Sequence, residues 1–117
     1  MKKFLAIYIG TPESRDKKWS GLSQTEINQK TQLGMKSWMA WGERHSRAIK
    51  DIGSPLGKTK RVDENGIADT KNAMTAFTIV EAESHEEAAK IFLSHPHFAI
   101  FPGDSIEIME CMPIPKG

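Results

Sequence analysis

The stretch MTAFTIVEAESHEEAAKIFLSHP, residues 74–96, places a strand directly before a helix, and it decides the fold class. Its first nine residues are rich in Met, Phe, Thr, Ile and Val, and most of these residue types favour β-strands. Ser84 and Glu87 then fit the capping box, in which the two side chains satisfy backbone N–H groups at a helix start. We predict a helix from Ser84 to about His95, since Pro96 disfavours helical geometry at the residue before it.

The same signals recur along the rest of the chain. Three further segments are predicted as strands: residues 4–9, residues 105–112 and, more weakly, residues 56–62 before the turn at 63–66. A second capping box, Ser23 with Glu26, begins a long helix, whereas residues 11–21 are expected to form a polar loop. The order βαββαβ predicts an α+β, ferredoxin-like fold, a four-stranded antiparallel sheet with two helices on one face.

The long helix has one face that we expect to be buried. Its residues recur at alternating spacings of four and three, as one side of an amphipathic helix requires: Ile27, Thr31, Gly34, Trp38, Trp41, His45 and Ala48. Gly34 and Gly42 each cost about 1 kcal/mol of helix propensity relative to Ala. Such a cost is expected where a helix passes close to a sheet or makes room for a ligand, and we favour close packing.

The sheet is expected to be apolar on both faces. Residues 4–9 are apolar at nearly every position. The strand at 74–82 also has apolar residues on both sides: Phe77 and Ile79 on one, and Met74, Ala76 and Val80 on the other. Helices on one side can cover only one of these faces, so we expect a homodimer that buries sheet against sheet.

Length and charge exclude several classes of partner. The 117 residues have the size of one compact domain, so we expect residues 1–117 to form a single domain. A net charge of +1 gives no overall field that would favour nucleic acid or a membrane surface.

The apolar part of the MKKFLAIYIG start is too short for a signal peptide, and no run approaches the roughly 20 residues that span a bilayer. With one cysteine, Cys111, we expect a cytoplasmic location.

Five segments, in this order, resemble the YCII-related family, also called DGPF-domain proteins: GSPL at 53–56, NGIADTK at 65–71, FTIVE at 77–81, EEA at 86–88 and SIEI at 105–108. The resemblance covers nearly the whole chain, although Asp-Gly-Pro-Phe itself is replaced by residues 65–68, and Asp69 occupies an acidic position of the family's pattern. It implies the dimeric α/β-barrel form of the ferredoxin-like fold. Most members have no assigned reaction, while lactone isomerases and dechlorinating enzymes of this barrel type suggest His/Asp acid–base chemistry.

His95 and His97 flank Pro96 and are the main candidates for chemistry. One alternative is acid–base use of either histidine with Asp69, because imidazole titrates near neutral pH. In an extended chain both rings would point to one side, as in some metal sites, but two ligands do not make a site and we expect no metal. The third alternative is structural, with His95 at the end of a helix and His97 at the start of a loop. Helix capping and the interaction of a histidine with the helix dipole favour this structural alternative.

Four other residues are candidates for lining a ligand pocket: Tyr8, Trp38, Trp41 and His45. His45 lies on the apolar helix face, and we favour a hydrogen-bonded core histidine over a pocket role. The tryptophans are expected to serve the core before any ligand. Cys111 has no basic neighbour in the sequence that would activate its thiol, so we expect no nucleophilic role.

Two functions remain open. The sequence has no nucleotide-binding, hydrolase-elbow or zinc-ribbon motif, and we expect no cofactor. The strand at 74–82 also lacks the basic and stacked aromatic residues of RNA-recognition domains. The first hypothesis is a small-molecule enzyme or ligand-binding protein that uses Asp69 with His95 or His97. The alternative is a non-catalytic dimeric module for regulation or metabolite binding, and a pocket with a titratable pair would separate the two.

Overall fold

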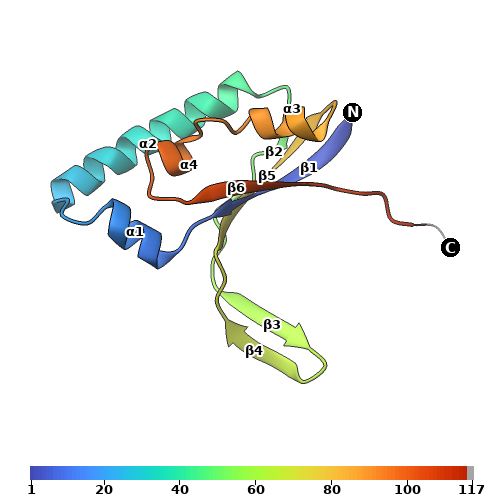
Figure 1. The fold of residues 1–117 in the computed structure, drawn as a ribbon, viewed down its shortest axis with the longest axis horizontal. Helices are drawn as coiled ribbons and strands as arrows, with labels where there is room; N and C mark the ends of the chain where they lie inside the picture. The colour runs from blue at the N-terminus through green and yellow to red at the C-terminus, as the bar shows by residue number, and fades with distance from the viewer. Residues whose placement is uncertain (116–117) are drawn as a thin grey trace.

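The computed structural model describes residues 1–115 and contains a four-stranded antiparallel sheet (Figure 1). Across the sheet the strands are β2 (Ile49–Asp51), β5 (Met74–Ala82), β1 (Lys2–Ile9) and β6 (Ser105–Glu110). The two central strands, β1 and β5, each have a hydrogen-bonded partner on both edges. The predicted α+β, ferredoxin-like fold class is confirmed.

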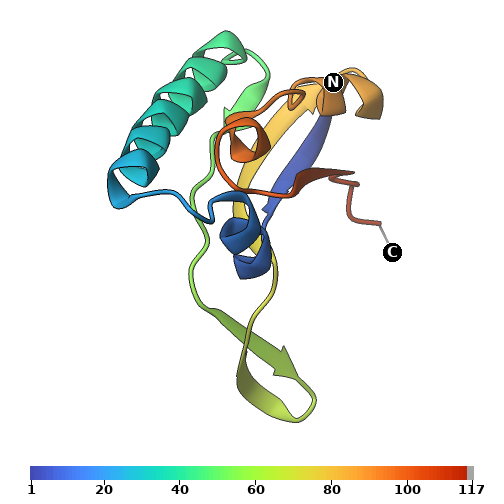
Figure 2. The ribbon, with the colours of Figure 1, turned by 60° about the vertical axis from the view of Figure 1, so that its left-hand side comes forward.

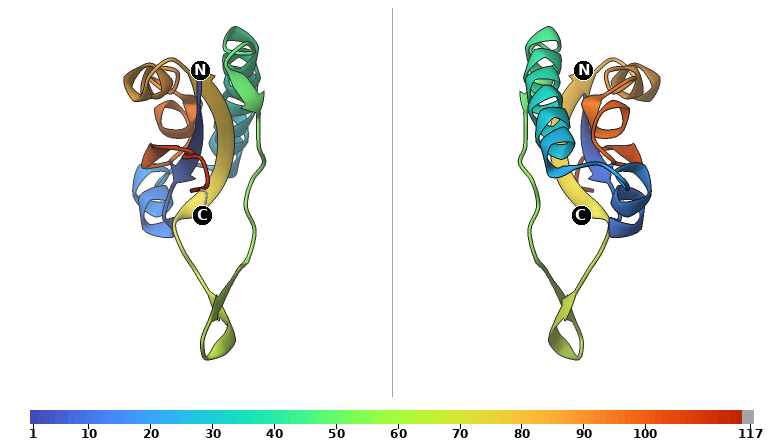
Figure 3. Two further views of the ribbon diagram at one scale, coloured as in Figure 1. Left: turned by 90° about the vertical axis from the view of Figure 1, so that its right-hand side faces the viewer. Right: turned by 90° about the vertical axis from the view of Figure 1, so that its left-hand side faces the viewer.

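One face of the sheet carries the core. Alternate residues of β1, namely Phe4, Ala6 and Tyr8, are fully buried and lie opposite Val80, Thr78 and Ala76 of β5. Trp41 of α2 (Gln24–Arg44), Ala88 of α3 (His85–Lys90) and Phe92 from the turn after α3 pack against them. All helices lie on this side of the sheet (Figure 3).

No helix within residues 1–115 covers the other face of the sheet. Leu5 pairs with Ile79 and Ile7 with Phe77, and all four side chains remain partly exposed in the single chain. The prediction that the central strands carry apolar residues on both faces of the sheet is therefore confirmed.

The long helix α2 (Gln24–Arg44) begins with the predicted capping box: Ser23 Oγ accepts from the Glu26 N–H at 3.1 Å, and the Glu26 side chain accepts from the Ser23 N–H at 3.2 Å. A Cβ placed on Gly34 would lie 2.5 Å from the Phe101 ring, so close packing explains this glycine. Thr31 departs from the predicted buried face and is exposed. Within residues 1–115, no helix is long and apolar enough to cross a membrane.

The second predicted helix is divided in two. Helix α3 (His85–Lys90) begins at the Ser84 cap but ends well before His95, and α4 (Pro96–Ala99) follows. Two features explain the break: Ser94 has a left-handed φ of 58°, and the Trp41 Nε1–H donates to the Ile91 carbonyl at 2.9 Å. The structural alternative placed His95 at the end of a helix and His97 at the start of a loop, and both placements were wrong. His95 instead precedes α4, and His97 lies within it.

Residues 11–21 are not simply a polar loop, because they contain helix α1 (Pro12–Lys18). Thr11 Oγ1 accepts from the Ser14 N–H at 3.1 Å, and Pro12 occupies the first turn, where its missing N–H costs nothing.

The weak strand expected at 56–62 does not join the sheet. The edge position next to β5 belongs to the short β2, while β3 (Thr59–Asp63) pairs with β4 (Gly66–Thr70) as a separate hairpin. Gly66 has a φ of 112°, which allows the tight turn between them. The hairpin projects away from the sheet (Figures 1 and 2).

Candidate functional site

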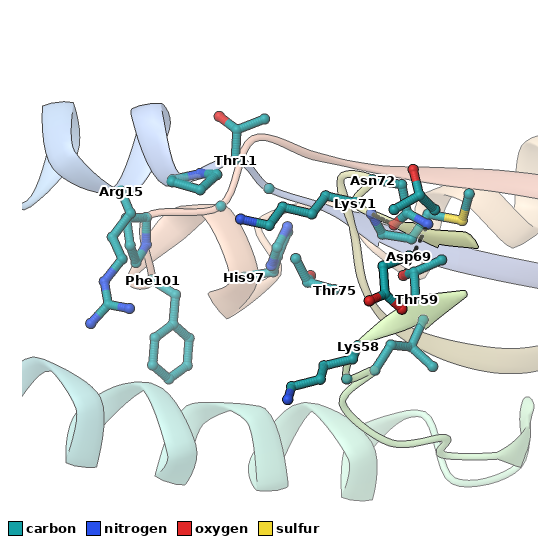
Figure 4. Close-up of a pocket in the computed structure, with 18 of the residues that line it drawn as sticks. Thr11, Arg15, Lys58, Thr59, Asp69, Lys71, Asn72, Thr75, His97 and Phe101 are labelled. Atoms are coloured by element: carbon teal, nitrogen blue, oxygen red, sulfur yellow. Dashed lines mark hydrogen bonds between the residues drawn. The ribbon is translucent and has the colours of Figure 1, made fainter. Parts of the chain in front are cut away.

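A pocket of about 950 Å³ lies where three segments meet. One wall is the end of β1 and the start of α1, the second is α4 with the loop to β6, and the third is the base of the β3–β4 hairpin (Figure 4). Its volume is in the range of small-molecule sites. His97 and Asp69 both line it.

The short helix α4 places His97 on the pocket wall. Pro96 occupies its first turn, and the ring of His95 provides the N-cap, with Nδ1 accepting from the His97 N–H at 2.9 Å. The His97 carbonyl in turn accepts from the Gly103 N–H at 2.9 Å, which closes the loop back over α4. The backbone of His97 is therefore held from both sides.

The His97 ring is fixed by the end of β1. Its Nε2 lies 2.8 Å from the Ile9 backbone oxygen, and because a carbonyl can only accept, Nε2 carries the proton. Burial lowers the pKa of His97 below its ordinary value, against the raising effects of the Ile9 and Ser105 backbone and of Asp104. At neutral pH the ring is therefore uncharged, and Nδ1 is the nitrogen that can accept a proton.

Gly103 packs directly on the His97 ring. A Cβ at this position would overlap the Cε1 and Nε2 atoms of the ring and would lie 2.5 Å from the His97 carbonyl oxygen. Only a glycine lets the loop approach the imidazole this closely. The sequence shows this residue as part of an ordinary Pro-Gly turn, so its role in the site could not be inferred from the turn signal.

Helix α1 braces the same loop. The Ser14 hydroxyl donates to the Asp104 carboxylate, and the Lys18 ammonium donates to the Gly103 carbonyl. These contacts join segments about 90 residues apart in the sequence, so the helix that sequence patterns missed also supports the site. The Thr11–Pro12 pair is the signal that could have revealed it.

Asp69 lies on β4 at the base of the hairpin and is held by a neighbouring cation. Its carboxylate is 2.5 Å from Lys60 Nζ, the residue opposite it on β3. Its side chain is 84% exposed. No hydrogen bond joins Asp69 to His97 within residues 1–115, so they share the pocket without forming a dyad in this state.

His95 is placed in the core and not in the pocket lining. Its ring is fully buried, with the rings of Trp38 and Trp41 both centred 4.4 Å away. Burial lowers its pKa to about 3, so the ring is neutral at pH 7. Because Nδ1 accepts the cap hydrogen bond, the proton lies on Nε2, which has no nitrogen or oxygen partner in the described chain.

Three of the four residues suggested as a pocket lining, Tyr8, Trp38 and Trp41, belong to the same aromatic core. The Tyr8 hydroxyl forms a hydrogen bond with Thr78 Oγ1 at 2.8 Å. Burial raises the pKa of Tyr8 to about 12. The Tyr8 ring contacts those of Trp38 and His95, at centroid distances of 5.0 and 5.1 Å. His45 follows α2 as its C-cap beside Trp41, and burial lowers its pKa. It is only partly buried, and its ring makes no hydrogen bond to residues 1–115, so the prediction of a hydrogen-bonded core histidine was wrong. None of these side chains is among those that line the pocket.

Three basic residues of the lining were not among the candidate site residues, since the sequence favours solvated surface for the basic stretches at residues 15–18 and 58–61. Arg15 comes from α1, Lys58 from the segment before β3, and Lys71 from the segment before β5. Each belongs to a short polar segment with no periodic pattern, and only the fold brings them together. Among residues 1–115, no group of three or more His, Cys, Asp or Glu side chains is arranged to hold a metal ion.

Comparison with known proteins identifies the fold. No family model matches the chain, and no curated protein matches it significantly. Among solved structures, one match is a 5-chloro-2-hydroxyhydroquinone dehydrochlorinase (TftG) from Burkholderia phenoliruptrix AC1100, in complex with 2,5-dihydroxybenzoquinone. The two chains are 20% identical, with a TM-score of 0.55, over 94% of this chain and 93% of the other. At this identity the likeness concerns the fold alone, which is the ferredoxin-like α+β fold.

Proposed function

We propose that the chain is a small-molecule enzyme of the YCII-related type and that His97 is its general base. The observation that carries the proposal is the His97 ring, which lies on the wall of an open pocket with Nε2 bonded to the Ile9 carbonyl. A base that is neutral at pH 7 and fixed by a backbone oxygen is prepared to accept a proton.

The reaction class is removal of a proton from an acidic O–H or C–H group of a small cyclic substrate. The proton moves to Nδ1 of His97, and the electron pair of the broken bond stays on the substrate as an enolate or phenolate. Expulsion of a leaving group such as chloride, with its bonding pair, completes an elimination, and the dehydrochlorinase of the same fold supports this class. Asp69 is the proposed second polar group, placed to contact the substrate from the hairpin side of the pocket.

The working unit is proposed to be a homodimer through the open sheet face. An apolar surface that no helix of the described residues covers is formed by Leu5, Ile7, Phe77 and Ile79. Burial of such a surface against a second copy is the simplest way to remove it from water, and the barrel class of the fold supports this arrangement.

A non-catalytic metabolite-binding module is the second candidate. The observation that favours it is the pairing of Asp69 with Lys60, which leaves no carboxylate bonded to the His97 ring within the described residues. This module would bind a ligand in the same pocket without transforming it.

Binding of 2,5-dihydroxybenzoquinone tests the proposal. His97→Gln keeps a side-chain N–H for the Ile9 carbonyl but removes the basic ring nitrogen, so it should fold and lose affinity. His85→Gln is the matched control, since His85 Nε2 also bonds a backbone carbonyl, that of Ile108 at 2.7 Å, but lies outside the pocket. We expect saturable binding by wild type and His85→Gln and at least about fivefold weaker binding by His97→Gln. Equal affinity in all three proteins would refute the role of His97.

A further inference from the structure

The pocket has an unequal distribution of charge. Four basic side chains line it, from Arg15, Lys58, Lys60 and Lys71, against a single carboxylate, that of Asp69. The chain as a whole has a net charge of only +1, so this excess is local. A concave site lined by one sign of charge concentrates its field on the ligand.

Pairing within the lining leaves an excess of three cations. Lys60 and Asp69 neutralise each other across the hairpin at 2.5 Å. Arg15, Lys58 and Lys71 take part in no ion pair with the residues that the structure describes. The cations left over come from three separate segments, and Figure 4 shows them on different sides of His97, with Arg15 to the left, Lys71 above and Lys58 below.

From this geometry we propose that the pocket selects a small anionic ligand, one that carries a carboxylate, phenolate or enolate group bound by Lys71, Lys58 and Arg15. The inference rests on the proposed function and specifies its substrate class. It also fits the proposed proton removal, because cations around the pocket stabilise the negative charge that develops on the substrate.

The same arrangement couples ligand charge to His97. The charged groups that face the ring are Lys18 from α1 and Asp104 from the loop before β6, while Tyr8 and His95 contact it as neutral groups. An anion held beside the ring favours its protonated form. By linkage, anion binding then raises the pKa of His97, and the affinity rises as the pH falls through that pKa.

Salicylate and salicylamide separate charge from shape, because they share ring and size and differ in charge at pH 7. Both would be titrated into the ¹⁵N-labelled protein by NMR at low and high salt. At 50 mM NaCl we expect salicylate to bind about tenfold more tightly than salicylamide. At 500 mM NaCl this difference in affinity should be smaller, because salt screens exposed charges. Equal affinity for the two probes would overturn the charge inference and leave the pocket proposal standing.

Substitutions of the lining lysines test whether the positive charge that attracts the ligand lies in the pocket. Lys58→Gln and Lys71→Gln should each weaken salicylate binding about two- to fivefold, the double variant about tenfold, and salicylamide binding should not change. Lys36→Gln on the exposed side of α2 is the matched control and should have no effect. No effect of the double variant, or an equal effect of the control, would overturn the inference. Failure of 2,5-dihydroxybenzoquinone binding to depend on His97 would instead count against the proposed function.

Discussion

The ring of His95 caps the helix that carries His97, with Nδ1 accepting a hydrogen bond from the His97 N–H at 2.9 Å. The two histidines around Pro96 thus have different surroundings: one is a core group, and the other reaches the pocket. Residues that look equivalent in the sequence therefore differ in place, with His95 as the N-cap of α4 and His97 in its first turn.

Replacement of His95 is expected to destabilise the fold. His95→Ala removes a helix cap and leaves a cavity among aromatic rings, so the free energy of unfolding should fall by about 2–4 kcal/mol. His95→Asn keeps a cap acceptor and should recover part of the loss. Urea unfolding monitored by tryptophan fluorescence measures both, and a wild-type midpoint for His95→Ala would contradict the capping role.

Acidification is expected to destabilise the protein through His95. Its pKa falls from 6.5 to about 3 on folding, so between these values the unfolded chain binds a proton that the folded chain does not. The free energy of unfolding should therefore be highest above pH 6.5 and fall by about 1.4 kcal/mol per pH unit below it for this one group. The pKa of His97 is also lowered, so this residue likewise decreases the free energy of unfolding as the pH falls. Urea titrations from pH 7 to pH 4 measure the slope, which His95→Asn should reduce; an unchanged slope in this variant would contradict the assignment.

Gly103→Ala should disturb His97 directly. The new Cβ overlaps the imidazole and its carbonyl, so we expect a loss of about 1–3 kcal/mol and a large shift of the His97 ring resonances. Gly57→Ala is the control, because its Cβ would meet nothing within 4 Å and its φ is not positive. Thermal melts and histidine NMR spectra compare the two. Similar behaviour of both variants would show that the loop is not held against the ring.

A charge on the open sheet face should dissociate the proposed dimer. Ile7→Lys places an ammonium opposite Phe77, where a buried interface could not solvate it. We expect a dimer of wild type and a monomer of the variant in sedimentation velocity at micromolar concentration. Ile67→Lys, on the 73% exposed tip of the hairpin, is the control and should sediment like wild type. A wild-type monomer would rule out the dimer proposal.

The central strands and the helix starts were predictable because their causes are local. The apolar runs that became β1, β5 and β6 and the caps at Ser23 and Ser84 carry their own signals. The edge strand β2 was not predictable, since its three residues are extended only through pairing with β5. The end of α3 likewise depends on Trp41, a residue 50 positions away.

The candidate site was only partly accessible from the sequence. His97 and Asp69 were named because of their chemical type, and the fold places both in one pocket. The contacts of α1 with the loop, the approach of Gly103 and the three cations without an ion pair in residues 1–115 come from distant segments, and no local pattern relates them. His95 could not be told apart from His97, because both are buried and differ only in whether the folded chain places them in the aromatic core or on the pocket wall.

The neutral His97 in a ligand-accessible pocket is the central claim, and ¹⁵N NMR of the histidine rings with and without saturating salicylate tests it most directly. We predict a neutral His97 with the proton on Nε2 at pH 7, and a rise in its pKa when salicylate binds, with little change at His85. A His97 ring that is charged at pH 7, or one whose resonances and pKa ignore bound salicylate, would contradict the account.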